Sequence, residues 1–227
     1  MASETAPQSA WVRRAARTAG VVVGCALGAG VTGWLAGSVA QAVAGDEKAA
    51  WILGRAAGLA SYALLVLLVA TGLVLSHPAR ARIRRPSSAA RIRAHVSLAV
   101  FSLALTGLHV VVLATDPYAG VGWRGTLVPL GSTYRTVPVT LGVLALYAGL
   151  LAGGTAALSG HRLVSRLWWP IHKVAAAAFL LVWAHGVFAG IDTPSLLWLY
   201  LGTGGGLLAL AVWRYVAVSP ADRVRAR

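Results

Sequence analysis

The sequence predicts an all-α integral membrane protein in which six transmembrane helices form a single domain over residues 1–227. Three observations support this fold class: 58% of the residues are hydrophobic, only 11% are charged, and the apolar residues gather into six long runs. Soluble globular domains have about 25% charged residues, and a bilayer core takes about 20 residues of helix to cross. The linkers between the runs are short, which leaves no room for a folded soluble domain.

The six predicted spans follow one another at 19–44, 51–76, 94–115, 136–158, 169–190 and 195–217. The first apolar run is longer than the roughly 7–15 apolar residues of a secretory signal. We therefore expect this helix to stay uncleaved, although AVAGDE at 42–47 offers a pattern that signal peptidase accepts. Its glycines at 20, 24 and 28 suit close helix packing. Cys25, the only cysteine, is expected to pack there as a small apolar side chain.

The net charge of +14 is divided unevenly between alternate loops. Sixteen basic residues on one side of the membrane stand against Glu4 and Asp222, whereas the other side has four basic and four acidic residues. Cytoplasmic loops carry such an excess of Lys and Arg. Both termini are therefore predicted to be cytoplasmic, in the inner membrane of a bacterial cell. The sixteen are Arg13, Arg14, Arg17, Arg80, Arg82, Arg84, Arg85, Arg91, Arg93, Arg162, Arg166, Lys173, Arg214, Arg223, Arg225 and Arg227.

The partner predicted for these cations is the lipid bilayer, because anionic headgroups attract basic loops at the cytoplasmic surface. No nucleic-acid partner is predicted, and docking of an acidic cytosolic protein is the alternative. Tryptophans near the ends of the predicted spans fit the aromatic belts of membrane interfaces. They are Trp51, Trp123, Trp168 and Trp169.

Four histidines lie in two of the predicted spans, where an ionisable residue marks a functional site by default. His95 and His109 are fourteen residues apart in the third span, and His172 and His185 are thirteen apart in the fifth. Both spans are predicted to run outward from the cytoplasm. His95 therefore lies at the depth of His172, and His109 lies with His185 about 20 Å further along. The sequence predicts two histidine pairs at two depths.

The angular positions differ between the two spans. Fourteen residues fall about 40° short of four full turns, so His95 and His109 share a face. Thirteen residues would leave His172 and His185 about 140° apart on a straight helix. We therefore expect local winding or an irregular first turn in the fifth span, for which Pro170 is the candidate.

Two imidazoles that face each other can ligate a heme iron, which then has no vacant position and suits electron transfer. The sequence predicts two stacked bis-histidine hemes between the third and fifth helices. Small residues would leave room for the macrocycles at Ala175–Ala178, Gly107, Ala184 and Gly186. The alternatives are hydrogen-bonded packing histidines, a zinc or copper site, and a proton relay. A zinc or copper site would cluster its ligands, and a proton relay usually recruits intramembrane Asp or Glu.

Arg55, near the outer end of the second span, has two interpretations. Its side chain either extends to the lipid headgroups or pairs with a propionate of the outer heme, as Arg pairs with carboxylates. His77 and His161 lie in predicted cytoplasmic loops and are expected to be solvated or interfacial. No catalytic residue is predicted.

Around these histidines the sequence resembles the ferric reductase-like transmembrane domain. That superfamily includes NADPH oxidases, ferric reductases and the membrane heme subunit of the bacterial methionine sulfoxide reductase system. The similar motifs are the two histidine spacings, WWPIHK at 168–173, WAHG at 183–186 and the segment 109–149, within a similarity over about 50–217. The resemblance implies six helices and two b-type hemes held by His95, His109, His172 and His185.

The resemblance also implies a function in the oxidoreductase class. It is a membrane cytochrome subunit that moves electrons from a cytoplasmic donor to an external acceptor, such as ferric iron or a periplasmic reductase. Many relatives continue into flavin- and nicotinamide-binding domains, whereas this sequence stops ten residues after the last predicted span. We therefore expect a separate cytosolic flavin reductase or a quinol as donor, and no reduction by NADPH alone. The alternative is a heme-free membrane scaffold or transporter subunit with the same fold.

The charge pattern makes a prediction about topology. Reporter domains fused after Arg227 or inserted within 80–93 should lie in the cytoplasm, and reporters within 116–134 should lie outside, because Lys and Arg are retained on the cytoplasmic side. Paired reporters that are active only inside or only outside the cell measure this directly. An external C-terminus would contradict the predicted topology.

Overall fold

The computed structural model describes residues 46–78, 80 and 85–216. The chain divides into two compact units, Met1–Ala49 and Ala50–Arg227. The part that the structure describes is helical and contains no strand. The first predicted span, with its glycines and Cys25, lies outside the described residues, as does most of the AVAGDE pattern. The cations at 13–17, 82–84 and 223–227 lie outside them too.

Five helical segments are long and apolar enough to cross a membrane, as expected of a multi-pass membrane protein. Five of the six predicted spans are thus confirmed as helices. The third begins six residues earlier than predicted, because the Ser87 side chain accepts a hydrogen bond from the amide of Ala90 (3.3 Å) and caps the helix there. The five segments are α2 (Ala49–Ser76), α3 (Ser88–Thr115), α5 (Thr136–Ala157), the pair α6 (Trp168–Ala177) and α7 (Phe179–Ala189), and α8 (Thr193–Tyr215).

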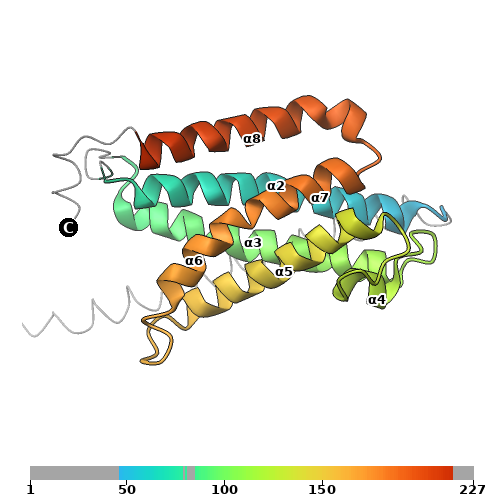
Figure 1. Ribbon diagram of the computed structural model, residues 1–227, viewed down its shortest axis with the longest axis horizontal. Helices are drawn as coiled ribbons and strands as arrows, with labels where there is room; N and C mark the ends of the chain where they lie inside the picture. The colour runs from blue at the N-terminus through green and yellow to red at the C-terminus, as the bar shows by residue number, and fades with distance from the viewer. Residues whose placement is uncertain (1–45, 79, 81–84, 217–227) are drawn as a thin grey trace, which may run out of the picture. The chain divides into compact units, whose positions relative to one another are not determined.

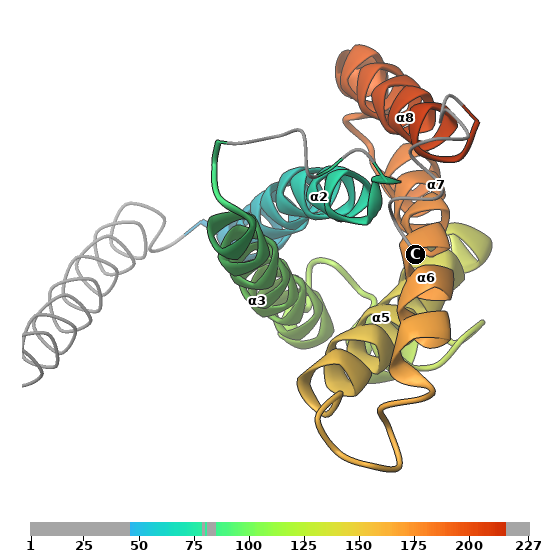
Figure 2. The same cartoon turned by 90° about the vertical axis from the view of Figure 1, so that its left-hand side faces the viewer.

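The long helices of the second unit pack side by side (Figures 1 and 2). α2 lies beside α3, and α5 packs against both α6 and α7. α8 packs on the side of α7 that faces away from α5. A short helix that was not predicted, α4 (Gly122–Leu127), follows α3 and packs against it.

The fifth predicted span is interrupted at Ala178, where α6 ends and α7 begins. Pro170 lies in the first turn of α6, where the missing amide is tolerated. Of the two expectations for this span, the local change of winding is therefore confirmed at Ala178, and the irregular first turn at Pro170 is not found. The carbonyl of Ala178 accepts hydrogen bonds from the amides three and four residues later (3.0 and 3.2 Å). A change of winding at this point alters the angle between His172 and His185.

The core of the second unit is an aromatic cluster between α2, α7 and α8. Tyr62 stacks on Phe179 with ring centroids 6.0 Å apart and meets Tyr200 edge-on at 5.2 Å. The Trp183 indole N–H donates to the carbonyl of Tyr200 (2.9 Å), and the Tyr62 hydroxyl bonds to the Thr203 hydroxyl. Aromatic side chains whose polar tips are hydrogen-bonded suit an apolar interior. The cluster fixes α8 to the rest of the unit.

The outward faces of the spanning helices are apolar. Only 6 to 17% of each apolar stretch is buried within the protein, and large side chains such as Val100, Phe101 and Leu144 are exposed. Apolar patches of this extent are unusual on soluble monomers and mark contact with a membrane or a partner. The lipid bilayer is the environment that these faces fit.

A polar contact joins α2 to α3 in the middle of this apolar bundle. The Ser61 hydroxyl contacts the Thr106 hydroxyl (2.6 Å) and lies 3.0 Å from the carbonyl of Ser102. The Ser102 hydroxyl in turn donates to the carbonyl of Ser61 (3.3 Å). Such interhelical hydrogen bonds and small side chains allow membrane helices to approach closely.

This contact makes a prediction about stability. Thr106→Ala should destabilise the folded protein by about 1 kcal/mol, the usual size of an interhelical hydrogen bond in a membrane. Equilibrium unfolding in mixed detergent micelles measures the change. Thr115→Ala is the matched control, because Thr115 is exposed on the same helix and bonds only to carbonyls of its own helix. Equal effects of the two substitutions would contradict the role of the contact.

Candidate functional site

The four histidines of the spans meet in two pairs. The ring centroids of His95 and His172 are 6.0 Å apart, with an interplanar angle of 65°. Those of His109 and His185 are 6.3 Å apart, at 77°. The pairing predicted from the sequence is therefore confirmed. Because the earlier histidine of each span meets the earlier one of the other, α3 runs parallel to α6 and α7.

We call His109–His185 the outer pair and His95–His172 the inner pair, and name the two ends of the bundle accordingly, after the topology that the sequence predicts. The two histidines of the outer pair are each held by a backbone carbonyl of a neighbouring helix. His109 Nδ1 lies 2.7 Å from the carbonyl of Gly54 on α2. His185 Nδ1 lies 2.9 Å from the carbonyl of Pro138 on α5. A carbonyl oxygen only accepts, so Nδ1 carries the proton in both rings. In the neutral imidazole this leaves Nε2 with a free lone pair.

His95 reaches the same protonation state through a hydroxyl. Its Nδ1 lies 3.0 Å from Thr71 Oγ1, and the Thr71 hydroxyl donates its proton to the carbonyl of Leu68 (2.9 Å). A hydroxyl has a single proton, so Thr71 accepts from His95 Nδ1–H. His95 Nε2 is then free, as in the outer pair.

His172 differs from the other three. Its Nδ1 is buried and finds no hydrogen-bond partner among the described residues. Its ring lies beside two neighbouring tryptophans, nearly parallel to Trp169 (6.3 Å, 13°) and inclined to Trp168 (5.9 Å, 58°). Lys173 extends over the Trp169 ring, with Nζ 5.2 Å from its centroid. These aromatic contacts hold the His172 ring in place of a hydrogen bond.

The acceptors Gly54, Pro138 and Thr71 were missed by reasoning from the sequence. A carbonyl is present at every residue, so residue type carries no sign of which one a histidine meets. Only the packing of α2 against α3, and of α5 against α7, identifies them. An acceptor that bonds to the second ring nitrogen in this way fixes the tautomer of a histidine that binds a metal.

Arg55 makes contacts that neither interpretation of the sequence included. Its guanidinium forms an ion pair with Asp192, in the turn between α7 and α8. It also lies over the Trp51 ring, 4.2 Å from the centroid. Arg55 directly follows Gly54, whose carbonyl holds His109. The residue is therefore at the outer end of the outer pair, with one acidic partner already present.

A second arginine fixes the outer end of α7. Arg135 donates to the carbonyls of Phe188 (2.7 Å) and Gly190 (3.4 Å), and the Tyr134 hydroxyl donates to the carbonyl of Ala189 (3.1 Å). The last carbonyls of a helix lack partners within the helix. The loop before α5 thus caps α7, which carries His185.

The remaining histidines stand apart from the pairs. His77 is only 3% exposed and stacks on Trp213, with ring centroids 3.7 Å apart. The expectation that His77 is solvated or interfacial is therefore wrong, because α8 packs over the end of α2. His161 is exposed, as predicted.

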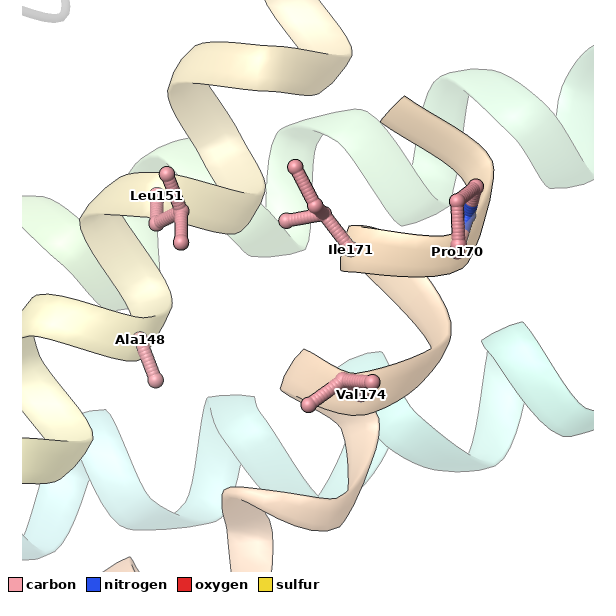
Figure 3. A pocket seen from close by; sticks show the side chains of 5 residues that line it. All are labelled: Ala148, Leu151, Pro170, Ile171 and Val174. Atoms are coloured by element: carbon pink, nitrogen blue, oxygen red, sulfur yellow. The ribbon is translucent and has the colours of Figure 1, made fainter. Parts of the chain in front are cut away.

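Space beside the helices was predicted for the macrocycles. An open pocket of about 260 Å³ lies between α5 and α6 and is lined by the apolar residues Ala148, Leu151, Pro170, Ile171 and Val174 (Figure 3), but His172 does not line it. A methyl group added at Gly107 would meet no atom within 4 Å. At Gly186 it would lie 2.9 Å from the Tyr200 ring, so Gly186 serves packing with α8 and not the predicted space. The side chains of 175–177 lie outside the described set.

No group of three or more His, Cys, Asp or Glu able to hold a metal ion occurs within residues 46–78, 80 and 85–216. The four histidines form pairs, each with two rings. Comparison with protein-family models, with curated proteins and with solved structures finds no match for this chain.

Proposed function

We propose that this chain is a membrane electron-transfer subunit of the ferric reductase-like kind, a b-type cytochrome with two hemes. His95 and His172 would ligate the inner heme, and His109 and His185 the outer heme. The observation that carries the proposal is the distance between the rings of each pair. The six-helix fold and the family membership belong to the same proposal.

The distances fit two imidazoles on opposite sides of one metal ion. A metal–imidazole bond is about 2.0–2.1 Å long, and the bonding nitrogen lies about 1.1 Å from the ring centroid, so the two centroids would be about 6.2 Å apart. The measured separations are 6.0 and 6.3 Å. Packing histidines in direct contact have no reason to keep this spacing at two depths.

The protonation states support the same proposal. A ligating histidine almost always donates its other N–H to an acceptor, which fixes the tautomer and raises the basicity of the ligand. His95, His109 and His185 all donate from Nδ1. A zinc or copper site fits less well, because the described part of the chain offers two histidines at each depth and no third ligand nearby.

When bound, heme iron would supply one-electron redox chemistry. The chain's own residues orient and insulate it. The carbonyls of Gly54 and Pro138 hold the outer rings, Thr71 holds His95, and the tryptophans beside His172 hold the fourth ring. The fourteen residues between His95 and His109 separate the two pairs by about 21 Å along α3. Electron transfer between the two histidine pairs would thus cover most of the thickness of the apolar layer.

The alternative is a heme-free membrane scaffold or transporter subunit. The observation that favours it is that three of the four histidines are already hydrogen-bonded inside the protein, as packing histidines would be. A dithionite-reduced minus oxidised spectrum of the purified protein separates the two proposals, because only the cytochrome gives b-type bands.

Substitution of the outer pair tests the ligand assignment. The His109→Ala/His185→Ala double variant should lose the outer heme and keep the inner one, because it removes both residues that would hold the outer heme and neither of those that would hold the inner one. The heme content per protein, measured as the pyridine hemochrome, should fall by half. His161→Ala, at an exposed histidine outside the spans, is the control and should keep the full content. An undiminished heme content in the double variant would contradict the assignment.

Arg55 is proposed to pair with a propionate of the outer heme, in addition to its contact with Asp192. Arg55→Gln should lower the midpoint potential of the outer heme, because loss of a nearby positive charge disfavours the reduced state. Asp192→Asn is the matched control: it breaks the same ion pair but keeps the cation, and should not lower the potential. Redox titration followed by absorbance measures both. An unchanged midpoint potential in Arg55→Gln would contradict the propionate contact and leave Arg55 with its ion pair to Asp192 alone.

The electron donor is proposed to be a cytosolic flavin reductase or a quinol, and the acceptor ferric iron or a periplasmic reductase. Exposed cations lie in the loop before α6 and next to His172, at Arg162, Arg166 and Lys173. Such a group attracts an acidic protein donor by long-range electrostatics, and the attraction weakens with salt. The proposed protein donor would therefore dock at the side of the inner heme.

Kinetics test this donor surface. Reduction by an acidic flavin reductase should slow as the salt concentration rises, and the Arg162→Gln/Arg166→Gln/Lys173→Gln variant should be slower at low salt and less sensitive to it. Arg124→Gln, an exposed cation of the opposite loop, is the control and should behave as the wild type. Stopped-flow absorbance measures the rates. A rate of reduction that does not change with salt concentration would contradict donor docking at these cations, whose role would then be lipid contact alone.

A further inference from the structure

Three glycines lie directly against three of the paired histidines. A Cβ atom added at Gly58 would lie 2.8 Å from His109 Nδ1, and one at Gly142 would lie 2.8 Å from His185 Nδ1. One at Gly72 would lie 3.3 Å from His95 Cε1. The first two distances are too short for any side chain, and the third is tight. Only glycine lets these rings approach so closely.

Two of the glycines stand four residues after a carbonyl that accepts directly from a histidine. Gly58 follows Gly54, which accepts from His109, and Gly142 follows Pro138, which accepts from His185. Gly72 stands four residues after Leu68, whose carbonyl accepts from the Thr71 hydroxyl, and that hydroxyl accepts from His95. The direct arrangement therefore occurs once on α2 and once on α5, and an indirect form of it occurs on α2.

Helix geometry explains why glycine is needed at that position. In a helix every Cα–Cβ bond tilts toward the N-terminus, so a side chain covers the turn that precedes it. A side chain four residues after a carbonyl lies over that carbonyl. Glycine leaves the carbonyl open, and its second lone pair can then accept from an imidazole of a neighbouring helix.

The spacing of the glycines on α2 matches that of the histidines on α3. Gly58 and Gly72 are fourteen residues apart, as are His95 and His109. The order is reversed, because Gly58 meets His109 and Gly72 meets His95. Two antiparallel helices of equal rise keep both contacts in register. This equal spacing is a sequence signal for the site that the histidines alone do not give.

We infer that Gly58, Gly72 and Gly142 are positioning residues for the heme ligands, an inference that rests on the proposed function. By opening the carbonyl four residues before it, each glycine lets that carbonyl, directly or through Thr71, hold Nδ1–H of one histidine. Nε2 of that histidine is then presented as the ligand nitrogen. The acceptor also increases the basicity of the ligand and so stabilises the oxidised iron.

A matched pair of substitutions on α5 tests the inference in the full-length holoprotein. Gly142→Ala places a methyl group against His185, whereas Gly154→Ala, on the same helix, meets no atom within 4 Å. Alanine favours helix over glycine at both positions, so a loss confined to Gly142→Ala does not come from helix propensity. Gly142→Ala and Gly58→Ala should lose the outer heme or shift its low-spin electron paramagnetic resonance signal, with the inner signal retained. Gly154→Ala should keep both signals.

Thr71 supplies a second test that does not add a methyl group against a ring. Thr71→Val keeps the shape but removes the hydroxyl, so the midpoint potential of the inner heme should rise as His95 loses its acceptor. Thr71→Ser restores the hydroxyl and should restore the potential. If the glycine variants do not accumulate, the Thr71→Val and Thr71→Ser variants still test the positioning role. The inner heme is identified as the one that persists in the His109→Ala/His185→Ala variant.

The outcomes separate this inference from the function on which it rests. A wild-type protein without b-type bands overturns the proposed function. Two hemes in the wild type, with unchanged signals and potentials in Gly58→Ala, Gly142→Ala and Thr71→Val, overturn the positioning role alone. Equal losses in Gly142→Ala and Gly154→Ala would also overturn it, because the effect would then belong to the helix and not to the contact.

Discussion

Three of the four paired histidines make hydrogen bonds to acceptors inside the membrane bundle, and the orientation of their rings depends on these bonds. Water is excluded there, and an unsatisfied polar group costs several kcal/mol. His109 and His185 use carbonyls of α2 and α5, and His95 uses Thr71. Because each Nδ1–H is fixed in this way, the tautomer of each ring is fixed as well. The helices that flank α3 and α7 thereby determine which nitrogen of each ring stays available.

α2 supplies hydrogen-bond acceptors to the paired histidines in addition to packing contacts. It carries acceptors for both histidines of α3, and its Ser61 contacts Thr106 between them. Its Tyr62 belongs to the aromatic cluster that holds α7 and α8. A single helix thus connects the inner and outer pairs to the packing of the unit. A small displacement of α2 would change the surroundings of three elements at once.

The two ends of the bundle are built differently. At the outer end, Arg55 pairs with Asp192 and Arg135 caps α7, so charges are used within the protein to join loops to helices. At the inner end, Arg162, Arg166 and Lys173 are exposed, and the ring of His172 rests on tryptophans instead of an acceptor. The outer pair is therefore held by more hydrogen bonds than the inner pair. Arg162, Arg166 and Lys173 are exposed for the proposed contacts with lipid or with a donor.

The sequence by itself determined five of the predicted spanning helices, the parallel run of α3 with α6 and α7, and the pairing of the histidines. These follow from local quantities: the length of an apolar run, the rise of a helix and the side on which cations lie. The tertiary structure alone decided the interruption at Ala178, the burial of His77 under Trp213 and the pairing of Arg55 with Asp192. It also decided which carbonyls the histidines meet. Such contacts join residues far apart in the chain, and a backbone acceptor has no residue type. The sequence therefore marks them only indirectly, through the glycine spacing on α2 that matches the histidine spacing on α3.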